Sequence, residues 1–222
     1  MSEIACPMTT VDPSIATLGP AKIPSPLDYC RFIPDDKRVR VELTNEDIDD
    51  ISGSCVAEFE VAGPRGKIYF DSSKVKCAIV TCGGLCPGIN DVIRAIVMEL
   101  SHNYRVAKTI GIRFGLQGFI PSYGYEPVEL TPKTVSDIHE FGGTVLGSSR
   151  GHQEPVEIVD ALERLNVSVL FIIGGDGTMK AARVIQNEVK KRGEKISVIG
   201  VPKTIDNDIN FVTQSFGFDT AV

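Results

Sequence analysis

The 222-residue chain has no excess of basic residues, because 23 Lys and Arg stand against 29 Asp and Glu and give a formal net charge of −6. Nucleic-acid binding needs a basic face, so this balance argues against it. The sequence also lacks an apolar run near the roughly 20 residues of a membrane span. Its first residues, MSEIACPMTTVDPS, lack the basic patch and apolar run of a secretory signal. We therefore expect a cytoplasmic protein that binds neither nucleic acid nor membrane.

Zinc-binding patterns are missing too, since the cysteines form no CxxC pair and no Cys/His cluster with zinc spacing. In a cytoplasmic protein we expect reduced thiols, most of them packed as small buried hydrophobes. Hydrophobic residues make up 42% and charged residues 23%, which is enough for a buried core. The cysteines are Cys6, Cys30, Cys55, Cys77, Cys82 and Cys86.

The N-terminal quarter of the chain is rich in proline. Residues 1–55 are predicted to form an extended, partly ordered arm, because frequent prolines interrupt any helix or central strand. Within it, the acidic stretch 44–50 is interpreted as a surface turn, with a short helix capped by Thr44 as the alternative. Residues 56–75 are predicted to be a hairpin-like lead-in, in which a Gly-Pro-Arg-Gly turn joins two strands.

Residues 76–222 alternate short apolar runs with helical stripes. Strands are predicted at 77–81, 109–112, 168–173 and 196–201. Helices are predicted at 89–100, 132–141 (capped by Thr131), 156–165 and 179–189. Strand, glycine turn and helix in repetition predict an α/β domain, with a doubly wound parallel sheet and helices on both faces. Ligands of such sheets bind beyond the carboxyl ends of the strands.

Residues 81–88 (TCGGLCPG) form a glycine-rich turn between a predicted strand and a predicted helix. Glycines let a phosphate approach main-chain N–H groups, and the N-terminus of the helix attracts its charge. Ile89 and Asn90 stand where a Walker A loop needs Lys and Ser/Thr, so this is a different kind of loop. Tight packing is the other interpretation of such a turn.

Residues 174–178 (GGDGT) place one carboxylate among glycines at the start of a predicted helix. The glycines leave space for a nucleotide phosphate chain, and Thr178 offers a hydroxyl. Mg²⁺ prefers oxygen ligands and keeps several waters, so Asp176 is a candidate ligand, directly or through water. The alternative is an Asp that caps the helix in a tight turn.

Two further segments carry charged side chains in loops. Residues 202–208 (PKTIDND) hold Asp206 and Asp208, of which one could take a proton from a hydroxyl while the other orients metal or substrate. A surface Asx-turn is the alternative. Residues 142–151 (GGTVLGSSRG) add Arg150, which could hold a nucleotide phosphate, stack on a base or lie on the surface.

In this order and at these separations, the four segments resemble the phosphofructokinase family over residues 78–222. GGDGT followed by PKTIDND is the most specific part, and 111–119 (GIRFGLQGF) adds support. The N-terminal arm resembles that of the plant-type ATP-dependent members. The resemblance implies an incomplete phosphofructokinase fold. It also implies a glycolytic, allosteric enzyme, a homo-oligomer when full length, that uses ATP and Mg²⁺ to phosphorylate the 1-hydroxyl of fructose 6-phosphate.

The resemblance also implies roles for individual residues. Gly84 would contact ATP phosphates, and Arg150 and Gly151 would border the nucleotide. The phosphate chain would be lined by Gly175, Asp176, Gly177 and Thr178, with Asp176 at the magnesium ion. The fructose 6-phosphate site would be lined by Thr204, Ile205 and Asp206, with Asp206 as the general base that deprotonates the sugar hydroxyl.

Two positions bear on the phosphoryl donor. Relatives that use pyrophosphate carry a second Asp where this chain has Gly177, and glycine leaves room for the α-phosphate of ATP. Lys203 is typical of pyrophosphate users, whereas bacterial ATP-dependent relatives have glycine there. Because the combination of Gly177 and Lys203 resembles the plant-type ATP enzymes, we expect ATP as the donor.

The last residues, 219–222 (DTAV), look like the start of a helix, and the family expects a longer chain with further arginines. We therefore expect that the 76–222 nucleotide-binding domain is truncated at its C-terminus, lacks much of the sugar-phosphate site and has little or no kinase activity alone. GGDGT also occurs in NAD kinases and diacylglycerol kinases, which are one alternative. A non-catalytic regulatory or docking fragment of a phosphofructokinase is another.

Overall fold

The computed structural model describes residues 15–28, 31–43, 55–209 and 212–222. The chain divides into two compact units, Met1–Tyr69 and Phe70–Val222. The acidic stretch 44–50, with the helix that Thr44 could cap, lies outside the described residues. In the described part of the chain, no helix combines the length and the apolar character needed to cross a membrane.

The first unit contains two small antiparallel sheets, so the predicted hairpin is wrong. One pairs β1 (Ile23–Pro24) with β4 (Lys67–Ile68), and the other pairs β2 (Arg38–Leu43) with β3 (Cys55–Glu60). Arg40 stands directly opposite Glu58, and their side chains form a 2.8 Å ion pair, which favours the distant partner strand. The backbone between β3 and β4 bonds to earlier residues as well, because the Ile33 N–H donates to the Pro64 carbonyl at 2.8 Å.

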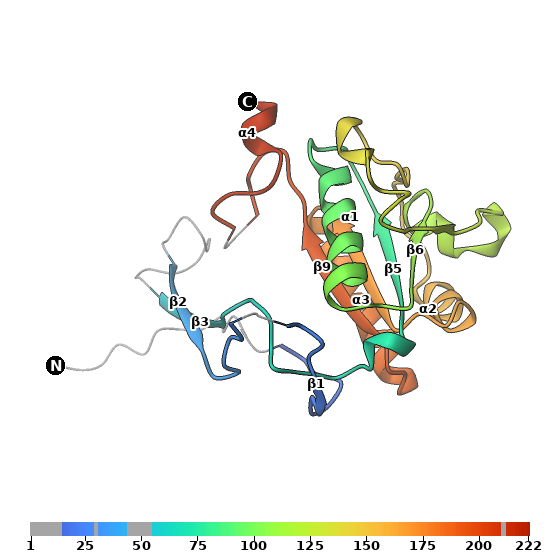
Figure 1. The fold of residues 1–222 in the computed structure, drawn as a ribbon. Helices are drawn as coiled ribbons and strands as arrows, with labels where there is room; N and C mark the ends of the chain where they lie inside the picture. The colour runs from blue at the N-terminus through green and yellow to red at the C-terminus, as the bar shows by residue number, and fades with distance from the viewer. Residues whose placement is uncertain (1–14, 29–30, 44–54, 210–211) are drawn as a thin grey trace. The chain divides into compact units, whose positions relative to one another are not determined.

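The second unit is built on one five-stranded sheet (Figure 1). Its strands are β5 (Lys76–Thr81), β6 (Lys108–Ile112), β7 (Val128–Glu129), β8 (Val169–Gly174) and β9 (Ser197–Pro202). The strand order is β7-β6-β5-β8-β9, and all pairs are parallel except β6 with β7. The four parallel strands match the sequence prediction, and the short antiparallel edge strand β7 is an addition to it.

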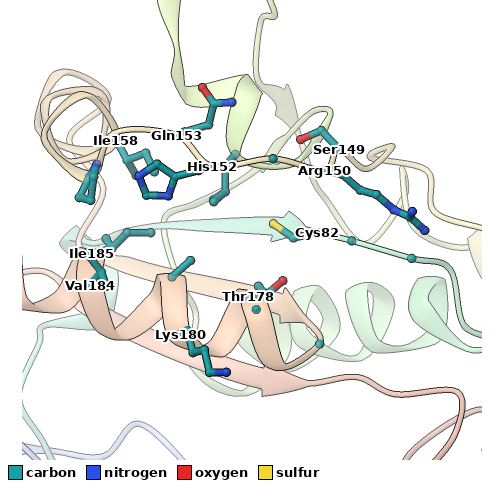
Figure 2. A pocket seen from close by; sticks show the side chains of 18 of the residues that line it. Cys82, Ser149, Arg150, His152, Gln153, Ile158, Thr178, Lys180, Val184 and Ile185 are labelled. Carbon is teal, nitrogen blue, oxygen red and sulfur yellow. The ribbon is translucent and has the colours of Figure 1, made fainter.

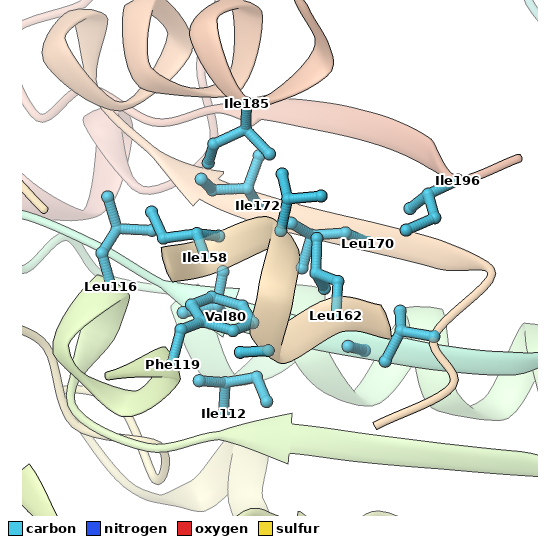
Figure 3. Close-up of a cluster of buried hydrophobic side chains, with 14 of the residues drawn as sticks. Val80, Ile112, Leu116, Phe119, Ile158, Leu162, Leu170, Ile172, Ile185 and Ile196 are labelled. Atoms are coloured by element: carbon cyan, nitrogen blue, oxygen red, sulfur yellow. The ribbon is translucent and has the colours of Figure 1, made fainter. Parts of the chain in front are cut away.

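Helices cover both faces of this sheet, which confirms the doubly wound prediction. The helices are α1 (Ile89–Met98), α2 (Pro155–Arg164), α3 (Asp176–Arg192) and α4 (Phe218–Ala221). On one face, α1 packs its buried Ile93 in a cluster with Ile79 of β5. On the other face, α2 and α3 bury Ile158, Leu162 and Ile185 with strand side chains such as those of Val80 and Ile172 (Figure 3). The buried, unpaired thiols of Cys77, Cys82 and Cys86 agree with the reduced state expected for them.

The helix predicted at 132–141 is wrong, because the segment forms turns followed by the short 3-10 helix η5 (Ile138–Glu140). Thr131 does cap the first turn, accepting from the Thr134 N–H at 3.2 Å. The Thr131 N–H in turn donates to the Thr134 hydroxyl at 2.8 Å, which completes a capping-box-like pair, so the start of the segment is capped although no α-helix follows. The buried side chains of Val135 and Ile138 join the α1-side core at a spacing of three, which suits a 3-10 turn.

The other irregular segments are the 3-10 helices η1 (Ser72–Lys74), η3 (Gly115–Phe119) and η4 (Pro121–Tyr123) and the π-helical turn η2 (Glu99–Asn103), which continues α1. The chain runs from β5 outward to β6 and then returns to the opposite side of β5 as β8. The carboxyl ends of β5 and β8 therefore flank the topological switch point, where open α/β sheets bind ligands.

Candidate functional site

A cleft of about 560 Å³ opens at this switch point. It is bounded by the loop after β5, by residues 149–153 before α2 and by the first turns of α3. In Figure 2, Thr178, Lys180 and Ile185 follow α3 along one side, His152 lies opposite, and Cys82 marks the end of β5 between them. The cleft is the size of a small-molecule site, with apolar walls and a few polar groups.

Backbone hydrogen bonds fix the glycine loop against its neighbours. The Cys82 N–H donates to the Ile173 carbonyl of β8 at 2.8 Å, and the Gly83 N–H donates to the Ser149 carbonyl at 3.2 Å. The Ser148 hydroxyl donates to the Gly83 carbonyl at 2.5 Å. The predicted phosphate loop and the predicted Arg150 segment are thus parts of one structure.

The GGDGT segment forms the start of α3, whose N-terminal dipole end lies at the cleft. At Gly174 any side chain would overlap Thr178, which is buried there, so packing requires this glycine. At Gly177, by contrast, an added Cβ would meet nothing within 4 Å, so packing does not require glycine there. The space beside Gly177 opens into the cleft.

Asp176 begins α3 with its side chain 75% exposed, and its carboxylate forms a 2.7 Å ion pair with Lys180. The alternative role for this Asp, a side-chain cap, is absent, because the residue at the N-cap of α3 is Gly175. Lys180 also lines the cleft and was missed in the sequence analysis. The signal for it was the four-residue spacing from Asp176, which places opposite charges on one helix face.

The PKTIDND segment starts beside GGDGT. Gly174 and Pro202 are paired in the β8–β9 register, and the Lys203 N–H donates to the Gly174 carbonyl at 2.9 Å. The Lys203 residue is only 7% exposed and lines the cleft. A buried cation thus faces the space between the two glycine-rich loops.

Beyond Lys203, a hydrogen-bonded turn presents the two candidate carboxylates. The hydroxyl of buried Thr204 accepts the Asp206 N–H at 3.1 Å and donates to the Asp208 carboxylate. Asn207 adopts a φ of +54°, and its side-chain carbonyl accepts the Ser215 N–H at 2.7 Å. The side chain of Asp206 is exposed, as is that of Ile205 before it.

Burial dominates the ionisation of the thiols at the site. Desolvation raises the pKa of Cys82 to about 12, although its backbone hydrogen bond with Leu116 and the positive charge of Lys203 act in the opposite direction. Burial raises the pKa of Cys86 as well. Both groups are therefore neutral thiols near pH 7.

Asn90 at the start of α1 supports the site from behind and was not predicted. Its side chain is 1% exposed, its amide donates to the Phe141 carbonyl at 2.9 Å, and its carbonyl accepts the Val145 N–H at 2.9 Å. These bonds hold the loop that leads to Arg150. The only sequence signal was a polar residue at the buried start of a helix.

Comparison with known proteins agrees with this geometry. The model of the family described as Phosphofructokinase matches residues 76–222. The chain belongs to the phosphofructokinase family. This membership argues against the alternative of an NAD-kinase-like or diacylglycerol-kinase-like enzyme.

Among similar phosphofructokinases, the ATP-dependent 6-phosphofructokinase of Borreliella burgdorferi is 48% identical over 96% of this chain and 49% of the relative. That of Amycolatopsis methanolica is 56% identical over 73% of this chain and 35% of the relative. ATP-dependent 6-phosphofructokinase 7 of Arabidopsis thaliana is 50% identical over 74% and 33%. The chain thus spans between a third and a half of the length of these relatives.

Solved phosphofructokinase structures share the fold. The pyrophosphate-dependent enzyme from Marinobacter aquaeolei gives a TM-score of 0.59 at 22% identity and covers 65% of this chain and 37% of its own. Phosphofructokinase from Saccharomyces cerevisiae gives 0.59 at 22% identity, covering 66% and 22%. At this identity the comparison shows the fold alone.

The structure brings most of the selected residues of this phosphofructokinase-family chain together. The cleft is lined by Gly84, Arg150, Gly151, Gly175, Gly177, Thr178 and Lys203. Thr204, Ile205 and Asp206 follow directly on the adjoining turn, and Asp176 lies between two lining glycines with its carboxylate turned to Lys180. The donor and acceptor segments therefore share one edge of the sheet.

Proposed function

We propose that the cleft binds the phosphates of MgATP and that Asp206 activates the 1-hydroxyl of fructose 6-phosphate, in the glycolytic 6-phosphofructokinase reaction. One observation carries the proposal: the Lys203 N–H bonds to the Gly174 carbonyl. This bond joins the start of the donor loop to the start of the loop that bears Asp206. Phosphoryl transfer requires chiefly that donor and acceptor be held in line and that charge be neutralised.

The donor phosphates have several partners in this proposal. The N-terminus of α3 offers partial positive charge at the switch point, and Gly84 in the cleft lining lets a phosphate approach the backbone of the glycine loop. Lys203 adds a full positive charge from a buried position. The exposed Arg150 borders the same cleft and would hold the nucleotide from the loop side.

Gly177 supports ATP as the donor. Neither packing nor backbone conformation requires glycine there, since a Cβ would meet nothing within 4 Å and its φ is not positive. A carboxylate at this position would reach into the space beside the phosphate loop and repel the α-phosphate of ATP. The named relatives given above as ATP-dependent support the same choice.

Mg²⁺ is part of the proposal because the oxygen ligands available at the start of α3 suit this ion. Asp176 supplies an exposed carboxylate beside the glycine-rich start of α3, and an ion that keeps several waters needs few protein ligands. Bound there with the phosphates, Mg²⁺ would neutralise negative charge on the transferring group. Lys180 would exchange its ion pair with Asp176 for contact with phosphate oxygens.

The acceptor side depends on the turn at Thr204. The Thr204 hydroxyl holds the Asp206 N–H and the Asp208 carboxylate, which leaves the Asp206 carboxylate exposed to take the hydroxyl proton. The sugar 6-phosphate needs cations, and Lys203, the one cation of residues 202–208, is already assigned to the donor phosphates. We propose that the cations for the 6-phosphate correspond to the part of the relatives' length that these 222 residues do not span.

Transfer of labelled γ-phosphate from MgATP tests this assignment. The 222-residue chain, its Asp206→Asn variant and, as a matched control, its Asp71→Asn variant in the turn before β5 would each be offered fructose 6-phosphate, NAD or a diacylglycerol. We expect transfer to fructose 6-phosphate and to neither of the other acceptors, lost in Asp206→Asn and kept in Asp71→Asn. Transfer to another acceptor, or full retention in Asp206→Asn, would refute the assignment.

The alternative of a non-catalytic fragment predicts that the chain and its Asp71→Asn variant bind MgATP but transfer no phosphate at any protein concentration. A cytoplasmic location and homo-oligomeric assembly are also parts of the proposal. Cell fractionation and sedimentation of the native protein test them.

A further inference from the structure

The thiol of Cys86 connects the glycine loop to the loop that carries Asp206. Cys86 is 3% exposed and follows the glycines of residues 81–88. Its thiol donates toward the Phe216 carbonyl at 3.1 Å, with the Thr204 carbonyl at 3.7 Å as a second acceptor. The contact spans more than a hundred residues of sequence and lies entirely within the second unit.

Close backbone packing holds the thiol in this place. Gly217 has a φ of +85°, and a side chain there would overlap the Pro87 carbonyl and lie 2.5 Å from the Cys86 sulfur. On the next residue of the loop, the Cβ position of Gly88 is 3.5 Å from the Phe216 ring. Segments 86–88 and 216–217 are therefore in direct contact, with the sulfur between them.

The carbonyl of Thr204, at the centre of the turn that carries Asp206, is the second acceptor of the Cys86 thiol. The Thr204 carbonyl also accepts the Ser215 hydroxyl at 2.8 Å, while its own hydroxyl accepts the Asp206 N–H at 3.1 Å. The Cys86 thiol is thus separated from the backbone of Asp206 by one residue. Movement of the glycine loop would be transmitted to Thr204 through this contact.

The thiol keeps its proton under ordinary conditions. Burial raises the pKa of Cys86, and the positive charge of nearby Lys203 lowers it by a smaller amount. A protonated thiol donates to carbonyl oxygens, whereas a thiolate would repel them. The arrangement therefore requires the neutral form.

We propose that Cys86 is a positioning residue that couples occupation of the phosphate loop to the placement of Asp206. The inference rests on the proposed function, because it takes residues 82–88 as the donor loop and Asp206 as the base. It goes beyond that function by naming a side chain that touches neither substrate. Ser in place of Cys86 keeps a donor, and Ala removes it.

Amide hydrogen exchange of the ligand-free chain tests the contact itself. The reporters are the N–H groups of Asp206 and Ser215, which bond to the side chains of Thr204 and Asn207. In Cys86→Ala we expect both to exchange about fivefold faster, the factor for one lost hydrogen bond, and in Cys86→Ser to stay within about twofold of wild type. Cys77→Ala, which removes another buried thiol from the middle of the sheet, is the matched control and leaves both amides unchanged.

Repeating the measurement with MgATP tests the coupling. We expect MgATP to slow the exchange of both reporter amides in wild type, Cys86→Ser and Cys77→Ala. In Cys86→Ala we expect MgATP to bind without slowing their exchange. Reporters that respond alike in wild type and Cys86→Ala, with or without nucleotide, overturn the role of Cys86. Failure of every variant to bind MgATP contradicts the proposed function instead, and the ligand-free rates still decide whether the thiol holds the turn.

Discussion

The amide of Lys203 lies 2.9 Å from the carbonyl of Gly174, the last residue of β8. This bond extends the β8–β9 ladder by one step into the loops and brings the GGDGT and PKTIDND segments to a common start. Lys203 is buried and lines the cleft beside both loops. The segments proposed to hold the donor and the acceptor are adjacent because two parallel strands end together.

Replacing Gly177 with Asp should weaken MgATP binding without lowering the thermal stability of the chain. The new carboxylate meets no atom of the fold and lies in the first turn of α3, where negative charge is favourable, so thermal stability should be unchanged or slightly higher. Its charge opposes the phosphates, and we expect MgATP affinity to fall on the order of tenfold. Calorimetric titration measures the affinity.

Gly142→Asp is the matched control, since Gly142 also has open space at its Cβ and lies outside the cleft lining. It should bind MgATP like wild type. Equal affinities for Gly177→Asp and Gly142→Asp would exclude Gly177 from the donor site.

Removing the Asn90 side chain should destabilise the fold. Asn90→Ala leaves the Phe141 carbonyl and the Val145 N–H without their buried partner, at a cost of about 2 kcal/mol in the free energy of unfolding. Urea denaturation provides the measurement. Asn103→Ala, which removes an exposed bond to Glu99, should change the value by less than about 0.5 kcal/mol, and similar losses in the two variants would contradict the structural role of Asn90.

Arg192 ties the end of α3 to α2 and makes stability depend on pH. Its guanidinium contacts Glu188 at 2.9 Å, Asp160 at 2.6 Å and Glu163 at 2.9 Å. The hydrogen bond from Arg192 lowers the pKa of Glu188 in the folded chain. Such a carboxylate stabilises the fold above its unfolded pKa, about 4.3, and this contribution disappears as the pH falls through the lower folded value.

We expect Arg192→Met to lower Tm by roughly 3 °C at pH 7, and the difference from wild type to shrink below about pH 4. Arg183→Met, on the same helix and without an ion pair among the described residues, is the control and should show little change. A difference that stays constant down to pH 3 would mean that packing, and not charge, accounts for the effect.

The buried thiols should resist alkylation. Burial raises the pKa of Cys77 and of Cys82 to about 12, so at pH 8 their thiolate fraction is on the order of a thousandfold below that of an ordinary cysteine. Peptide mapping after iodoacetamide treatment should find both unlabelled in the folded chain and labelled in urea. Rapid labelling of Cys82 without denaturant would show that the floor of the cleft is open to solvent.

The central sheet could be predicted from sequence because its signals are local. Apolar runs ending in glycine marked β5 and β8, and the 3.6-residue stripe marked α1, so the selected loops were placed at the carboxyl ends of these strands. Sequence patterns could not show that packing requires glycine at 174 but not at 177. That difference depends on the contact of Thr178 with Gly174 in the folded structure.

Contacts between distant segments account for the misses. The partner of β3 is β2, which precedes it in the chain, and not the strand beyond the nearer Gly-Pro-Arg-Gly turn. The bonds of Asn90 to residues 141–145 and of Cys86 to residues 204 and 216 join segments that no periodicity relates. In residues 131–140, the first turn is capped as expected, but Val135 and Ile138 are buried in the α1-side core from turns and a 3-10 helix in place of the expected α-helix.

The most direct test is an amide chemical-shift titration of the full chain with MgATP. The proposed function predicts saturable shifts at the amides of Gly83, Gly84, Gly175, Gly177 and Thr178, with none at the control amide of Gly142. The same titration of Gly177→Asp should require far more nucleotide. Absence of saturable shifts in the millimolar range, or shifts that cluster away from the ends of β5 and β8, would contradict it.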